Sequence, residues 1–236
     1  MDIRLKFKDG SLEPTDFREV LSRIQIVTAE MAAIDPTLDH WYARGKSRDE
    51  ALLYPAFENG EPSTAILAVL THKFAEDPDT TYVALWDGNE DDDRGATLAC
   101  HLHAPGRVNT FEVSLSDKSM LGNLDSVLRI VRAAAVAFKP AYIAVAPRSY
   151  AARQVFDDKP GVGWMIYLPT TITQQQVPEA REIVPVPEAG KTQTGTIVVS
   201  TTDAPFSMKN PEHVETANRI EIRLVDQDLL PAFADL

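Results

Sequence analysis

The chain has 236 residues, of which 44% are hydrophobic and 25% are charged, and it carries a formal net charge of −12. This composition is ordinary for a globular protein with a substantial core, and the negative charge argues against binding to nucleic acid or to an anionic membrane, because both repel it. The single cysteine, Cys100, excludes a disulfide within the chain. Because no apolar run reaches the roughly 18 residues that a membrane span needs, and the first residues lack a signal-peptide pattern, we expect a cytoplasmic protein.

The first part of the chain predicts one strand followed by helices. Ile3, Leu5 and Phe7 alternate with basic residues, which is typical of a half-buried strand. Apolar residues three and four apart then indicate a helix, and the capping box that starts at Ser47 indicates another. The expected elements are a strand at 3–7, a helix at 14–34, an extended piece at 38–43 and helices that begin near 47 and 62.

The middle of the chain predicts a meander of strands and then a buried helix. Pro105–Gly106 marks a turn between two of the strands. An apolar stripe from Leu121 to Phe138 indicates a long helix that Pro140 stops. Two short, fully apolar segments follow, and such segments are typical of central strands. The expected strands are 82–86, 96–103, 108–115, 141–146 and 164–168.

After Pro169 the chain becomes rich in glutamine and proline, which favours a long surface segment. We expect this segment at about 170–193, with a short helix at 179–183, and a strand at 194–201.

The last part of the chain carries a strong helix-start signal. Asn210 suits the cap position, Pro211 suits the first helical position, and the helix is expected to end before Pro231. Residues 220–224 also alternate as a strand would, but the cap favours a helix. The whole chain, 1–236, is predicted to form one α+β domain, with a largely antiparallel sheet of six or seven strands and helices packed on it.

Five acidic residues stand among the seven from Asp87 to Asp93. The stretch does not match a calcium-binding EF-hand loop, because Asp92 and Leu98 stand where that loop needs glycine and glutamate. It can be a solvated hairpin tip, a metal site completed from elsewhere, or an acidic patch that binds a basic partner. The residues expected at such a partner contact are Trp86, Asp87, Glu90, Asp91, Asp92 and Asp93.

His101 and His103 are separated by one residue on a predicted strand, so their side chains point to the same face. Two imidazoles at this spacing can share a zinc ion with a nearby acid, and a metal-dependent hydrolase that uses them is the alternative function. The commoner explanation is two polar residues on the exposed side of a strand. No phosphate-binding glycine loop, nucleophile elbow or Cys-x-x-Cys pair is present in the sequence, so we expect neither an enzyme nor a cofactor.

Several short segments have a common likeness. They are 163–169 (GWMIYLP), 195–200 (GTIVVS), 210–214 (NPEHV) and 219–223 (RIEIR), together with Trp41–Tyr42, Gly45 and Glu50–Ala51 in the first half. These segments resemble the immunity protein 52 family over most of the chain. The resemblance implies a bacterial cytoplasmic immunity protein that is paired with a polymorphic toxin, often one with a restriction-endonuclease-like domain delivered by a type VI secretion system.

An acidic chain without an enzyme motif also suits an inhibitor of a basic nuclease, because nuclease clefts are positive in order to hold phosphate. We therefore expect an immunity protein that neutralises its cognate toxin by non-covalent occlusion, with the 87–93 stretch in the contact. A metal-dependent hydrolase is the rival function. A small-ligand or scaffold module is a third alternative, which the sequence neither supports nor excludes, and the sequence does not indicate an oligomeric state.

Overall fold

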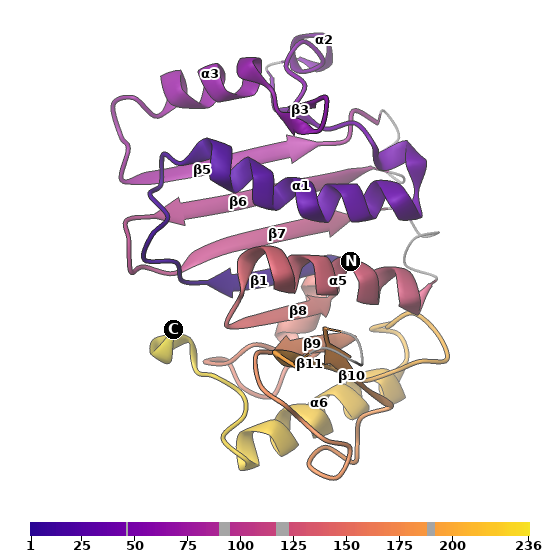
Figure 1. Ribbon diagram of the computed structural model, residues 1–236. Helices are drawn as coiled ribbons and strands as arrows, with labels where there is room; N and C mark the ends of the chain where they lie inside the picture. The colour runs from indigo at the N-terminus through magenta and orange to yellow at the C-terminus, as the bar shows by residue number, and fades with distance from the viewer. Residues whose placement is uncertain (46, 90–94, 117–122, 188–191) are drawn as a thin grey trace.

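A single large sheet organises the chain (Figure 1). The computed structural model describes residues 1–45, 47–89, 95–116, 123–187 and 192–236. In this part of the chain nine strands pair antiparallel in the order β10-β11-β9-β8-β1-β7-β6-β5-β2, and β3 and β4 form a separate hairpin. The strands are β1 (Asp2–Phe7), β2 (Tyr42–Ala43), β3 (Phe57–Glu58), β4 (Glu61–Pro62), β5 (Thr80–Trp86), β6 (Ala96–His103), β7 (Asn109–Leu115), β8 (Tyr142–Ala146), β9 (Met165–Leu168), β10 (Glu182–Val186) and β11 (Gly195–Val199).

Two long helices, α1 (Phe17–Ile34) and α5 (Leu124–Phe138), pack side by side on one face of the sheet (Figure 1). The side chains that face them are apolar and buried. Aromatic rings pack between the helices and the sheet. The ring centroid of Phe138 in α5 lies 5.2 Å from that of Phe7 in β1 and 4.5 Å from that of Phe111 in β7. The other helices are α2 (Arg48–Ala51), α3 (Thr64–Lys73) and α6 (Pro211–Asp226), with 3₁₀ turns η1 (Pro36–Leu38), η2 (Arg148–Ala152) and η3 (Phe233–Asp235).

Among the described residues, those that cover the opposite face of the sheet lie at the β8 end. At the β8 end, η2 and the segment after it lie over the sheet, and α6 is tied to that segment because Glu221 accepts hydrogen bonds from the backbone N–H groups of Val155 and Val162. Over β1, β7, β6 and β5, the residues that point to this side are half-buried or exposed, apart from the buried Asp2, while their sequence neighbours are buried. An antiparallel sheet commonly has one such solvated side.

Most of the predicted elements are confirmed. Helix α1 begins at Phe17, a few residues after the predicted start, and ends at Ile34 as expected. The final helix is confirmed, because Asn210 accepts a hydrogen bond from Glu212 N–H and Pro211 occupies the first helical position. Ser47 likewise caps α2. The first residues of the helix predicted from Leu121 lie outside the described part of the chain.

Two predictions were wrong. The sheet has nine strands instead of six or seven, and residues 179–183 do not form a helix. Glu182 already belongs to strand β10, which pairs with β11 and carries Pro185 at the sheet edge. Proline is tolerated in an edge strand because its missing N–H leaves no inner partner unpaired. Among the described residues, no helix has both the length and the apolar character needed to cross a membrane.

Candidate partner-binding surface

The solvent-facing side of β5, β6, β7 and β1 is called here the open face. Strand register places its residues in rows across the sheet. Trp86 stands opposite Thr97, Ala84 opposite Ala99, and Tyr82 opposite His101. On β5 and β6 the alanines therefore form a low row between two rows of larger side chains, and on β7 the same row continues with Glu112, which stands opposite Ala99. The sequence neighbours of the alanines are buried on the helical side.

Trp86 is half-buried at one margin of the open face. It stands opposite Tyr42 of β2, with ring centroids 6.4 Å apart. A shallow groove of about 340 Å³ adjoins it. Residues from the segment around α2, from β5 and from β6 line this groove, namely Arg44, Gly45, Ser47, Arg48, Ala51, Trp86 and Thr97. A large aromatic side chain beside a groove is a common anchor in protein interfaces.

Asp87, the first acid of the predicted contact, has a role inside the chain. Its side chain is only 7% exposed, and its carboxylate accepts hydrogen bonds from the N–H groups of Asn89 and Ala96, each at 3.2 Å. Burial raises the pKa of Asp87, while these hydrogen bonds oppose the rise. The other predicted acids, Glu90, Asp91, Asp92 and Asp93, lie outside the described residues.

His101 and His103 point to the same side of β6, as the spacing predicts, and Cys100 is buried on the other side. The ring of His101 lies 5.7 Å from the ring of Tyr82, between centroids. Within the described ranges, no group of three or more His, Cys, Asp and Glu side chains is placed to hold a metal ion. Whether acids at 90–93 could complete such a group with the two histidines lies outside the described residues.

Charged side chains lie on the open face where β1 and β7 form it. Arg148 of η2 donates to Asp2 at 3.2 Å and to Glu112 at 3.1 Å, and Arg4 lies 3.6 Å from Asp2. Such ion pairs at a surface each stabilise the fold by less than about 1 kcal/mol. Their effect is to fix the positions of four charges along one margin.

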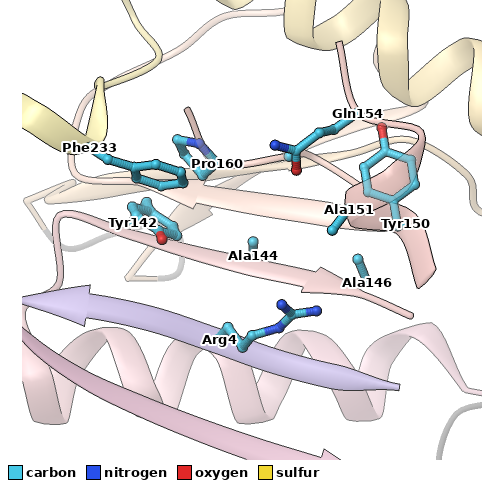
Figure 2. Close-up of a pocket in the computed structure, with 10 residues that line it drawn as sticks. Arg4, Tyr142, Ala144, Ala146, Tyr150, Ala151, Gln154, Pro160 and Phe233 are labelled. Carbon is cyan, nitrogen blue, oxygen red and sulfur yellow. The ribbon is translucent and has the colours of Figure 1, made fainter. Parts of the chain in front are cut away.

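A small hollow of about 100 Å³ lies where this margin meets the covered end of the sheet (Figure 2). Ala144 and Ala146 of β8 form its floor, with Arg4 on one side and Gln154 on the other. Tyr142 and Phe233 close one end, with ring centroids 6.3 Å apart. The hollow can accept one side chain of a partner but not a drug-sized ligand, since ligand pockets measure about 300–1,000 Å³.

Comparison with known proteins shows the family of this chain. The model of a family described as Immunity protein 52 matches residues 16–233. The chain belongs to this family. Its fold is similar to that of the Pseudomonas aeruginosa T6SS protein PA0821, with 13% sequence identity and a TM-score of 0.53, over 94% of this chain and 72% of that one. No curated protein matches this sequence.

The strands that carry most of the open face lie inside the range matched by the immunity protein 52 model, whereas β1 lies outside it. Trp86 is the only residue of the predicted contact that the described structure places on the open face. The sequence did not single out Arg148 or Phe233, because nothing local connects them to strands more than thirty residues away.

Sequence reasoning also missed a buried polar network in this immunity protein 52 chain. Glu221 is 1% exposed, and its carboxylate accepts a hydrogen bond from the hydroxyl of Tyr150 at 2.6 Å. Burial and the negative charge of Glu221 both raise the pKa of Tyr150. A signal was present, because Glu221 follows Ala217 by four residues and precedes Leu224 by three, which places an acid on the apolar stripe of α6.

Proposed function

We propose that this chain neutralises a cognate toxin by binding it non-covalently and occluding it, without catalysing a reaction. The observation that carries this proposal is the family match over residues 16–233. The likeness of the fold to a protein titled as a T6SS protein supports a toxin of the type VI secretion system. The chain would act in the cytoplasm of the cell that makes the toxin.

The toxin is proposed to be a nuclease with a basic, restriction-endonuclease-like domain. The support is electrostatic, because a chain with a net charge of −12 is attracted to a positive phosphate-binding cleft and repelled by the nucleic acid that normally occupies it. Attraction of this kind raises the association rate, and the rate falls as salt screens the charges. The acids at 87–93 are proposed to contribute to this attraction.

The test has two parts: a toxin gene is expected beside the gene for this chain, and the chain is expected to inhibit the product of that gene. The toxin domain is expressed in a bacterial host with and without the chain, and nuclease activity is then titrated with purified chain. Growth rescue and complete inhibition at one chain per toxin are expected for occlusion. A toxin that stays active in the presence of excess chain would refute the proposal.

The stoichiometry distinguishes occlusion from catalysis. A chain that modified or degraded the toxin would inhibit many toxin molecules per chain, and inhibition would grow with time. A stable complex that elutes as one species, with inhibition that is immediate and limited by stoichiometry, supports a binding protein.

A further inference from the structure

The hollow where the open face meets the covered end of the sheet has an apolar floor and a positive wall. Strand register places Arg4 of β1 opposite Ala144 of β8, and Lys6 opposite Tyr142. Lys6 also lies over the ring of Phe233, with 4.1 Å between its Nζ and the ring centroid. A ligand of this hollow therefore meets basic side chains from β1 and, beside them, alanine and aromatic surface (Figure 2).

Arg4 keeps most of its hydrogen-bonding capacity. In the described part of the chain its ion pair is with Asp2, and the 3.6 Å between Nη2 of Arg4 and Oδ2 of Asp2 is too long for a hydrogen bond. Asp2 is held instead by Arg148 at 3.2 Å and by the hydroxyl of Ser114 at 3.1 Å. A guanidinium carries five N–H donors in a planar fork, so Arg4 can present two of them to a ligand.

The hydroxyl of Tyr142 is a second donor at the hollow. Tyr142 is only 6% exposed, yet its hydroxyl has no hydrogen-bond partner among the residues that the structure describes. Burial raises the pKa of Tyr142 to about 12, against the opposing effect of the charge on Arg4, so the hydroxyl keeps its proton at neutral pH. Buried hydroxyls usually have a partner, and one without a protein partner at the wall of a hollow can donate to a ligand.

Gln154 stands on the opposite wall of the hollow (Figure 2). Its NH₂ group donates to the backbone carbonyls of Phe156 at 2.7 Å and Lys159 at 3.4 Å. Its side-chain oxygen lies beside Gly161, another residue of the lining, since a Cβ at Gly161 would come within 2.9 Å of that oxygen. An oxygen on this wall repels an anion, so the anionic end of a ligand is expected on the side of Arg4.

We propose that the hollow binds a carboxylate group, with the guanidinium of Arg4 and the hydroxyl of Tyr142 as donors and the stem of the ligand over Ala144 and Ala146. The volume of about 100 Å³ suits a carboxylate on a short stem, which is either an acidic side chain of a partner protein or a small free carboxylate. Arginine pairs with carboxylate and with phosphate, but the alanine floor and the rings of Tyr142 and Phe233 favour a ligand with an apolar stem.

The net charge of the chain does not decide binding at this hollow. The chain carries −12, but at about 0.1 M salt exposed charges more than about 10 Å apart are largely screened. The acids nearest to Arg4 on the sheet, Asp2 and Glu112, are both bound by Arg148. In the described structure Asp235 of η3 and the C-terminal carboxylate are not within ion-pair distance of Arg4. The donors at the hollow therefore set the local preference.

The test is a titration of the folded wild-type chain with sodium acetate, in place of sodium chloride at constant ionic strength. The NMR shifts of the backbone N–H groups of Ala144 and Ala146 report binding. Acetamide, which has a similar shape without the charge, and inorganic phosphate are titrated in parallel. The variants are Arg4→Gln, Tyr142→Phe and, as matched control, Arg18→Gln at an exposed position of α1 on the helical side. Thermal unfolding of each variant confirms that it is folded.

We expect acetate to saturate these shifts with a Kd on the order of 10 mM, as suits a ligand with four non-hydrogen atoms. Arg4→Gln should weaken binding at least about tenfold and Tyr142→Phe about fivefold, while Arg18→Gln should bind as wild type does. Shifts that do not saturate, or that are the same in Arg4→Gln, overturn the site. Acetamide or phosphate that binds as tightly as acetate overturns the assignment to a carboxylate.

A pair of blocked tripeptides distinguishes the two sources of the carboxylate. One has glutamate between two glycines and the other has glutamine there. Binding of the glutamate peptide alone, lost in Arg4→Gln, supports an acidic side chain of a partner protein. Binding of acetate without the glutamate peptide supports a small free carboxylate, because the hollow then leaves no room for a chain. Since the test uses no toxin, failure of the site leaves the proposed immunity function standing.

Discussion

Replacing Glu221 by glutamine tests the buried network that fastens α6 to the covered end of the sheet. The carboxylate accepts from the Tyr150 hydroxyl at 2.6 Å, from Val162 N–H at 2.9 Å and from Val155 N–H at 2.7 Å. Both oxygens are used, one of them twice. A glutamine has the same shape but only one acceptor atom, so its NH₂ group must face a backbone N–H or the Tyr150 hydroxyl.

The expected loss follows from that mismatch. A hydrogen bond to a charged group contributes about 1.5–3 kcal/mol, and a buried donor left without an acceptor costs a similar amount. Removing the buried charge recovers part of the desolvation cost, so we expect Glu221→Gln to lower the free energy of unfolding by about 2 kcal/mol. Tyr150→Phe, which removes one of the three bonds, should cost about 1 kcal/mol.

The assay is urea unfolding at pH 7, with Glu215→Gln as the matched control at an exposed position of the same helix. The control should change the free energy of unfolding by less than about 0.5 kcal/mol. If Glu221→Gln were equally neutral, the network would not hold α6 in place and the reasoning would be refuted.

A pH series gives a second readout on the same variant. Burial raises the pKa of Glu221 in the folded chain, against the opposing effect of its hydrogen bonds. A raised pKa means that the folded state binds the proton more tightly, so this contribution to stability is fully present below the unfolded pKa and is lost as pH rises through the folded pKa. The stability difference between wild type and Glu221→Gln should therefore grow as pH falls, and a difference that shrinks would contradict the raised pKa.

Three further predictions concern other groups of the chain. Replacing the aspartates at 91–93 by asparagine should slow association with the toxin and weaken its salt dependence, which stopped-flow measurements at several salt concentrations would check; unchanged rates and salt slope would exclude these acids from the contact. Hydrogen bonds from Ser11 and Arg23 lower the pKa of Asp9 to about 2, so Asp9→Asn should cost about 1 kcal/mol at neutral pH, a difference that disappears as pH falls from 3.8 through about 2. The purified chain should contain no stoichiometric zinc by elemental analysis, and one zinc per chain that is lost when His101 and His103 become alanine would favour the hydrolase.

The sequence predicted those elements whose residues repeat with a clear period or carry a cap. Alternation identified β1, and the cap at Asn210 correctly outweighed the strand-like alternation of residues 220–224. The strands of the large sheet that were not predicted as strands are its two edges, although β2 lies within the extended piece expected at 38–43. β2 has only two residues, and β10 carries Pro185 and follows glutamine-rich sequence, so neither shows the period by which a strand is recognised.

The candidate surface was harder to predict, because it depends on which face of the sheet the helices leave open. The sequence gives the alternation of β5 and β6, but alternation alone does not say that Trp86, Ala99 and His101 share a face with residues of β1. That grouping comes from strand order, which brings β1 beside β7 although more than a hundred residues separate them. The opposite error occurred at Asp87. Its negative charge suggested a contact with a partner, but its carboxylate accepts hydrogen bonds from the backbone N–H groups of Asn89 and Ala96.

The alternation of β5 and β6 also separates two kinds of evolutionary change. Val83 and Leu85 fill the core under the helices, while Ala84 between them faces outward. An outward substitution leaves the core residues on either side unaltered, so it costs the fold little. Mutations at every second residue of these two strands therefore change the solvent-facing surface of such a chain, and the scaffold survives each step.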